Sequence, residues 1–172
     1  MYKRQVLISE DFHVRQWGME FFAIKTSWLQ ALIHYLEERR KISLDKSVTS
    51  TLELIQIGEH ALTTNPARLL QAAKMWAAGE WTEDQFIDFC SIIGQDGAGF
   101  VSHWDVGYKT IRGLWGINGL DSVRAKSTSI LLRNLIRIQP EITNQILDAA
   151  EANIQERALS DYIRAWRIGH FV

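Results

Sequence analysis

The chain has 172 residues, 47% of them hydrophobic, with 19 basic against 20 acidic side chains, 2 prolines and 1 cysteine. This length fits one domain, and few prolines with a high apolar fraction exclude a largely disordered chain. One cysteine excludes an intramolecular disulfide framework and a cysteine-based zinc site, and favours a reducing, cytoplasmic location. A net charge of −1 excludes a global attraction to nucleic acid or anionic membranes. No apolar run reaches the ~18 residues of a membrane helix, and no secretory leader is visible.

The first five residues, Met1 to Gln5, resemble the translated end of a transposase-type sequencing adapter. A gene predicted at the edge of a metagenomic contig would carry such a remnant. An ordinary basic N-terminus is the alternative interpretation. The charges of Lys3 and Arg4 are therefore left out of the functional reasoning.

Helical periodicity extends through the first third of the chain. A short helix is predicted to end at Trp17, before Gly18, and a longer one to run from Met19 to about Lys41. Apolar rows on two neighbouring faces predict that this longer helix is largely enclosed and central to the fold. A third helix is predicted from about Leu44 to Leu62. Residues 5–8 read as a short extended piece for which the sequence offers no partner strand.

Start and stop signals divide the remainder of the chain into further helices. Asn65 followed by Pro66 marks a helix start, because asparagine caps the N-terminus and proline fits the first turn. Thr82 and Gln85 have the spacing of a capping box. The predicted helices cover residues 65–79, 82–94, 98–115, 121–138 and 140–167. The sequence thus predicts an all-α fold, a single-domain irregular bundle of seven or eight helices over residues 1–172.

Two segments, beginning at Ser122 and Asn153, match in the order of their basic, hydroxyl and apolar residues. This match indicates a short HEAT-like helical-repeat array, whose stacked helices offer a long binding surface. The alternative is that any two amphipathic helices align when their apolar faces are placed in phase. The bundle and the repeat array both stay open.

Candidate catalytic residues do not form a recognisable set. Cys90 shares an apolar helix row with Phe86, so burial is expected to leave its thiol inert. The glycines from Gly94 to Gly99 resemble a phosphate-binding loop, yet a helix precedes them where such a loop requires a strand. No catalytic residue, metal site or cofactor is therefore predicted. The remaining alternative is an enzyme or cofactor binder with a site near His103 and Asp105.

Two of the seven tryptophans lie at predicted helix ends. Trp81 precedes the Thr82 cap, and Trp115 lies beside Gly116. An exposed tryptophan at the end of an element is a favoured anchor of protein interfaces. Trp81 and Trp115 are therefore the predicted partner-binding residues.

Charge is divided along the second half of the chain. Residues 75–108 carry acidic side chains and no lysine or arginine, whereas residues 109–137 are predominantly basic. A basic stripe on neighbouring helices predicts contacts with a phosphate backbone, and ordinary solvated helix faces are the alternative. The predicted nucleic-acid-binding residues are Lys126, Arg133, Arg137, Arg164 and Arg167.

The function expected from these observations is that of a non-enzymatic helical interaction protein, a small subunit or regulator that binds a protein partner. One alternative is a nucleic-acid backbone-binding accessory subunit of a ribonucleoprotein or DNA complex. The other is an enzyme or cofactor binder. No membrane association is expected, and the adjacent acidic and basic segments leave a homo-oligomer open.

Overall fold

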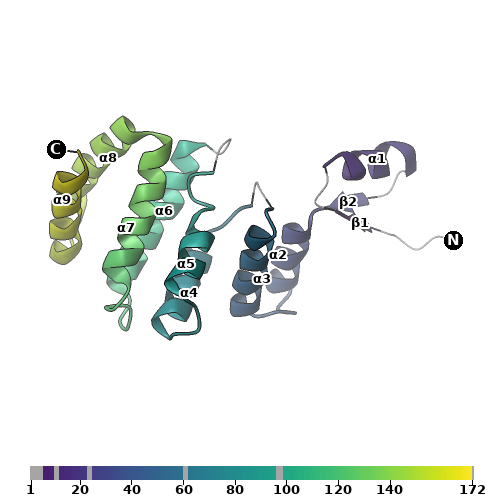
Figure 1. Cartoon of the computed structure of the whole chain (residues 1–172), viewed down its shortest axis with the longest axis horizontal. Helices are drawn as coiled ribbons and strands as arrows, with labels where there is room; N and C mark the ends of the chain where they lie inside the picture. Colours follow the sequence, from purple (N-terminus) through teal and green to yellow (C-terminus); the bar gives the residue numbers. More distant parts are fainter. Residues whose placement is uncertain (1–5, 10–11, 23–24, 60–61, 96–98, 172) are drawn as a thin grey trace. The chain divides into compact units, whose positions relative to one another are not determined.

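The computed structural model describes residues 6–9, 12–22, 25–59, 62–95 and 99–171. Contacts group the chain into two compact units, residues 1–62 and 63–172. Helices dominate both units, which confirms the predicted all-α class (Figure 1). Among the described residues, no helix is long and apolar enough to cross a membrane.

The first unit begins with a strand–helix–strand segment. Its elements are β1 (Val6–Ile8), α1 (Phe12–Phe22) and β2 (Lys25–Ser27), and the two strands pair in parallel. The extended piece near residues 5–8 therefore has a partner strand, contrary to expectation. The predicted helix from Met19 to Lys41 is also wrong, because β2 interrupts it. Thr26 and Ser27 have low helix propensity, and pairing with β1 outweighs the apolar periodicity across them.

Two packed helices, α2 (Leu29–Glu38) and α3 (Leu44–Gln56), complete the first unit. Ser43 caps α3 by accepting a hydrogen bond from the Lys46 N–H at 3.2 Å. The helix ends earlier than predicted because Gly58, with φ of +87°, turns the chain out of the helical path. Ile33 of α2 and Val48, Leu52 and Leu54 of α3 are buried.

The second unit contains six helices among its described residues. They are α4 (Pro66–Ala77), α5 (Glu83–Cys90), α6 (Phe100–Gly116), α7 (Arg124–Ile138), α8 (Pro140–Asn153) and α9 (Arg157–Phe171). Asn65 caps α4, and Thr82 with Gln85 forms the predicted capping box of α5. The single helix predicted over residues 140–167 is wrong. The chain is extended at Ile154, and α9 folds back onto α8 to bury Leu159.

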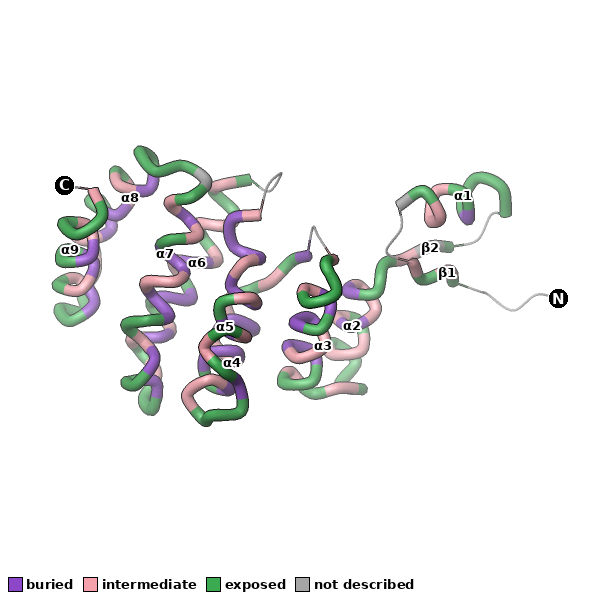
Figure 2. Tube along the Cα trace, in the orientation of Figure 1, coloured by how far each residue is buried: buried purple, intermediate pink, exposed green. Residues whose placement is uncertain are grey.

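In the second unit α4 packs against α5, and α6, α7 and α8 each pack against the helix that follows. The helix α6 also contacts α4, and α5 contacts α7 (Figure 1). Buried residues alternate with exposed ones along these helices (Figure 2). Two glycines of α6 permit close approach: a Cβ at Gly107 would lie 3.1 Å from Leu135, and one at Gly113 2.7 Å from Leu70. Small residues therefore set the spacing of α6 from its neighbours.

Gly113→Ala is expected to lower the free energy of unfolding by about 1 kcal/mol. The added methyl must displace Leu70, at a cost of about 1–3 kcal/mol, while alanine returns about 0.5–1 kcal/mol of helix propensity. Gly116→Ala is the matched control, because the methyl added there would have no neighbouring atom within 4 Å. Urea unfolding of the two variants measures the difference. Equal stability of both variants would contradict a tight α4–α6 contact.

Candidate functional site

Trp81 is not the exposed anchor that the sequence predicts. Its side chain is 6% exposed and packs edge-on against Phe89, with ring centroids 5.6 Å apart. The reason is the turn before it. Gly79 adopts a φ of +77°, and the Trp81 N–H donates to the Met75 carbonyl at 3.2 Å, which folds the indole back into the core. Trp81 is therefore a core residue.

Trp115 of α6 is half-buried and contacts side chains of two other helices, α7 and α9. Its Nε1–H donates to Thr128 Oγ1 at 3.0 Å, and its ring lies 5.3 Å from that of Tyr162. The Arg124 guanidinium lies over the same ring at 5.6 Å. The indole joins α6, α7 and α9, and its partner-binding role stays a prediction.

The acidic and basic segments of the sequence meet in the fold. Lys126 of α7 pairs with Glu83 of α5 at 2.7 Å. Arg137 of α7 donates to the Gly94 carbonyl at 3.1 Å, just beyond the end of α5. A cation there also complements the negative end of the helix dipole. Two of the five predicted phosphate contacts therefore serve the α5–α7 contact.

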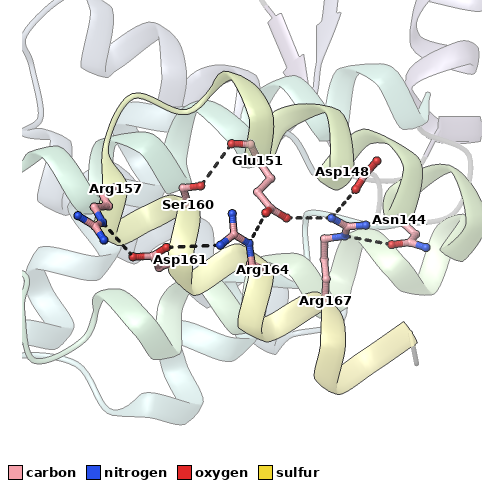
Figure 3. Close-up of polar contacts among 8 residues, drawn as sticks. All are labelled: Asn144, Asp148, Glu151, Arg157, Ser160, Asp161, Arg164 and Arg167. Carbon is pink, nitrogen blue, oxygen red and sulfur yellow. Dashed lines mark hydrogen bonds and ion pairs between the residues drawn. The ribbon is translucent and has the colours of Figure 1, made fainter.

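Two further predicted contacts, Arg164 and Arg167, join α9 to α8 (Figure 3). Both bind Glu151, at 2.5 and 2.9 Å, and Arg167 also reaches Asp148 at 2.7 Å. The Arg164 hydrogen bond is the main reason that the pKa of Glu151 lies below its ordinary value. Arg133 is exposed and makes no ion pair with another described residue. The structure thus does not bring the five cations together as one free stripe.

His103 and Asp105 point away from each other on α6, because residues two apart on a helix differ by about 200°. His103 Nδ1 accepts a hydrogen bond from the Gly94 N–H at 2.7 Å, and burial lowers the pKa of its imidazole. Asp105 pairs with Lys109 at 2.7 Å on the exposed side. They do not form a common site. Part of the glycine loop, residues 96–98, lies outside the described residues.

Cys90 is fully buried, and this burial raises the pKa of its thiol. Its carbonyl accepts a hydrogen bond from Asn134 Nδ2 at 2.8 Å, so the residue lies at the α5–α7 contact. Within the described parts of the chain, no group of three or more His, Cys, Asp or Glu side chains could hold a metal ion. The geometry around Cys90 therefore favours a structural role for this residue.

The free energy of unfolding is expected to decrease as the pH is lowered below 6.5, the ordinary pKa of the His103 imidazole. The unfolded chain takes up the proton first, so the stabilisation is complete above 6.5 and is lost as pH falls through the lower folded pKa. Denaturant unfolding between about pH 7.5 and pH 5 measures this change. His103→Asn keeps a hydrogen-bond acceptor near the Nδ1 position but has no group that titrates in this range. The variant should therefore show a weaker dependence of the free energy of unfolding on pH. An unchanged profile in this variant would contradict the assignment.

The most exposed aromatic surface lies in the first unit and was missed by sequence reasoning. Trp17 is 57% exposed, Phe21 72% and Phe22 70%, and Met19 beside them is also exposed. We call these four residues the α1 apolar surface. Among the α1 residues whose exposure is described, Gly18 alone is buried (Figure 2). The sequence predicted enclosure because several sides of this stretch are apolar, whereas the first unit provides too few elements to cover them.

Other apolar side chains of the first unit, outside the α1 apolar surface, are exposed as well. Trp28, which follows β2 directly, is exposed, and the Arg15 guanidinium lies over its ring, 5.8 Å from the centroid. Val6 and Ile8 of β1 are exposed as well. A sequence signal for this surface is an apolar arc wider than the ~100° stripe with which an amphipathic helix covers its core.

The first unit thus displays large apolar side chains, and the second uses its polar and aromatic residues mainly to hold its own helices together. Compared with family models, curated proteins and solved structures, the chain matches none.

Proposed function

We propose that this chain is a non-enzymatic interaction protein that binds a protein partner through the α1 apolar surface. The observation that carries the proposal is the exposure of Trp17, Phe21 and Phe22 on one short helix. Clustered exposed apolar side chains mark interaction sites, and tryptophan is enriched among the residues that dominate interface energies. A cytoplasmic location, based on the lone cysteine, belongs to the proposal.

The energies involved are sufficient for a specific interface. Complete burial of one large apolar side chain is worth about 1.5–3 kcal/mol. Trp17 and Phe21 lie four residues apart, so they share one face of α1 and can enter the same partner groove. Together they would supply several kcal/mol, which is the scale expected of interface hot spots.

We also propose that the second unit is a short array of HEAT-like helical pairs rather than an irregular bundle. In support, contacts join α4 with α5, α6 with α7 and α8 with α9, and further contacts join α4 with α6 and α5 with α7. The two segments that resemble each other in sequence coincide with α7 and α9, the second helices of successive pairs. Such an array would serve as a scaffold.

Nucleic-acid binding and an enzymatic or cofactor-binding role have less support. Lys126, Arg137, Arg164 and Arg167 already have partners within the chain. His103 and Asp105 lie on different sides of one helix. A protein partner therefore fits the described residues best.

The test is affinity capture with three tagged forms of the chain from extracts of cells that encode it. The wild type and Ile57→Ser should retain the same proteins, because Ile57 is exposed outside the α1 apolar surface. Trp17→Ser with Phe21→Ser should lose at least one of them, while far-UV circular dichroism stays unchanged. Identical captured sets from all three forms would contradict the proposal.

A further inference from the structure

In the part of the chain that the structure describes, the β1–α1–β2 segment has no further strand beside it. Among the described residues, its sheet contains only β1 and β2, and α1 contacts both strands. An isolated two-stranded sheet is marginally stable in water, and three or more strands are usually needed. The segment is therefore expected to gain strands from outside.

We infer that β1 pairs antiparallel with β1 of a second copy of this chain, centred on Leu7. Two segments then form one continuous sheet in the order β2–β1–β1–β2. This inference rests on the proposed function, since it names a second copy as the partner of the α1 apolar surface.

The backbone of β1 presents the groups that such pairing requires. The Ser9 N–H donates to the Ser27 carbonyl at 3.0 Å, on the side of β2. Hydrogen-bonding groups alternate between the two sides of a strand, so those of Leu7 also face β2. The N–H and carbonyl groups of Val6 and Ile8 consequently point to the outer edge of β1, where they are available to another strand.

The register of this pairing is self-complementary. With Leu7 opposite Leu7 of the second copy, Val6 of each chain lies opposite Ile8 of the other. These are hydrogen-bonded positions, and every cross-strand pair is apolar. A charged residue would normally protect such an edge, and Lys25 provides one on β2, whereas β1 has none. The outer edge of β1, which no charged residue of this strand protects against pairing, is therefore also the edge that can pair with its own copy.

The same arrangement places the exposed side of α1 against its counterpart. Among the described residues of α1, Gly18 is the buried one and marks the side that faces the strands, with Arg15 about 60° to one side of it and Phe21 about 60° to the other. Arg15 lies over Trp28, which directly follows β2, so we take the Arg15 side as the β2 side. Trp17 and Phe21 lie about 160° and about 120° around the helix from Arg15, which puts them on the β1 side. A two-fold axis at the β1–β1 junction keeps both helices on the same face of the sheet. Trp17 and Phe21 then face the same residues of the second copy.

The spacing of sheets and helices agrees with this arrangement. Neighbouring strands lie about 4.8 Å apart, so two helices that each cover a β1–β2 pair would lie about 10 Å apart. Packed helices have interaxial distances of about 8–10 Å, which matches. One interface therefore extends the sheet and covers Trp17 and Phe21 of α1.

Sedimentation velocity of the full chain over a range of concentrations tests the inference. The wild type should approach twice the monomer mass of 19.8 kDa. Val6→Lys with Ile8→Lys should sediment as a monomer, because the pairing places lysines opposite each other. Val6→Glu with Ile8→Glu should do the same. Ile57→Lys, on an exposed residue at the end of α3, is the control and should remain dimeric.

Mixing the lysine and glutamate variants is the decisive step, because antiparallel pairing then places each lysine opposite a glutamate. Restored dimers support the inference. A wild type that stays monomeric, charged variants that still dimerise, or a mixture that stays monomeric would each overturn it. A monomeric wild type that still loses a captured protein in the Trp17→Ser, Phe21→Ser form would overturn this inference alone. If no captured protein is lost either, the proposed function fails as well.

Discussion

Trp81→Ala is expected to lower the free energy of unfolding by about 3–5 kcal/mol, the range for removing a large aromatic side chain from a core. The indole is almost fully buried and packs against Phe89, which is itself completely buried. The Trp81 N–H donates to the Met75 carbonyl, which holds the backbone of this turn against the core. A loss of this size approaches the whole stability of many small domains.

Trp17→Ala is the matched control for this experiment, because it makes the same substitution at an exposed tryptophan. Its effect on the monomer should stay within about 0.5 kcal/mol, as is usual for surface positions. Denaturant unfolding followed by far-UV circular dichroism compares the two variants at a concentration where the chain is monomeric. Similar midpoints for both would restore Trp81 as a candidate surface anchor.

Glu151→Ala is expected to lower the free energy of unfolding by about 1 kcal/mol, the upper end of the range for ion pairs with an exposed partner, because the carboxylate binds two arginines. The Glu151 carboxylate is largely shielded from water and accepts hydrogen bonds from Arg164 and Arg167 across the α8–α9 contact. Without it, the ion pair that Arg164 keeps among the described residues is the 4.0 Å contact with Asp161. Glu156→Ala is the control, since Glu156 pairs with Arg112 in an exposed position and should have a smaller effect.

The Glu151 contribution also has a defined pH dependence. The pKa of Glu151 is lowered in the folded chain, chiefly by the Arg164 hydrogen bond. The stabilisation is therefore present above the ordinary carboxyl value of 4.5 and is lost as pH falls through the lower folded pKa. The difference in stability between wild type and Glu151→Ala should shrink in acid. A difference that stays constant down to complete protonation would show that the ion pairs contribute nothing.

The sequence predicted those parts of the fold that depend on local interactions. The caps at Asn65 and Thr82 lie within three residues of the backbone groups they bind, so composition and spacing were sufficient. The interruption at β2 depends on pairing with β1, and the interruption at Ile154 accompanies the packing of α9 back onto α8. Apolar periodicity continues through both points, and the sequence therefore joined helices that the fold separates.

The candidate site was harder to predict because exposure depends on which elements surround a side chain. Trp81 looked exposed in a short connection, yet a turn at Gly79 returns it to the core. Lys126 and Glu83 belong to segments of opposite charge, and their pairing across 43 residues removes the apparent stripe. Trp17 and Phe21 looked buried because apolar periodicity does not distinguish a face covered by the chain itself from one left for a partner.

Photo-crosslinking in cells that express the chain tests its central claim, that the α1 apolar surface binds a protein. A benzophenone-bearing phenylalanine analogue replaces Phe21 in one form and Ile57 in the other, both of which are exposed positions. Position 21 should give a discrete adduct, either with a second copy or with another protein, which mass spectrometry identifies. Position 57 should not give that adduct. The same adducts at both positions, or none at position 21, would contradict the claim.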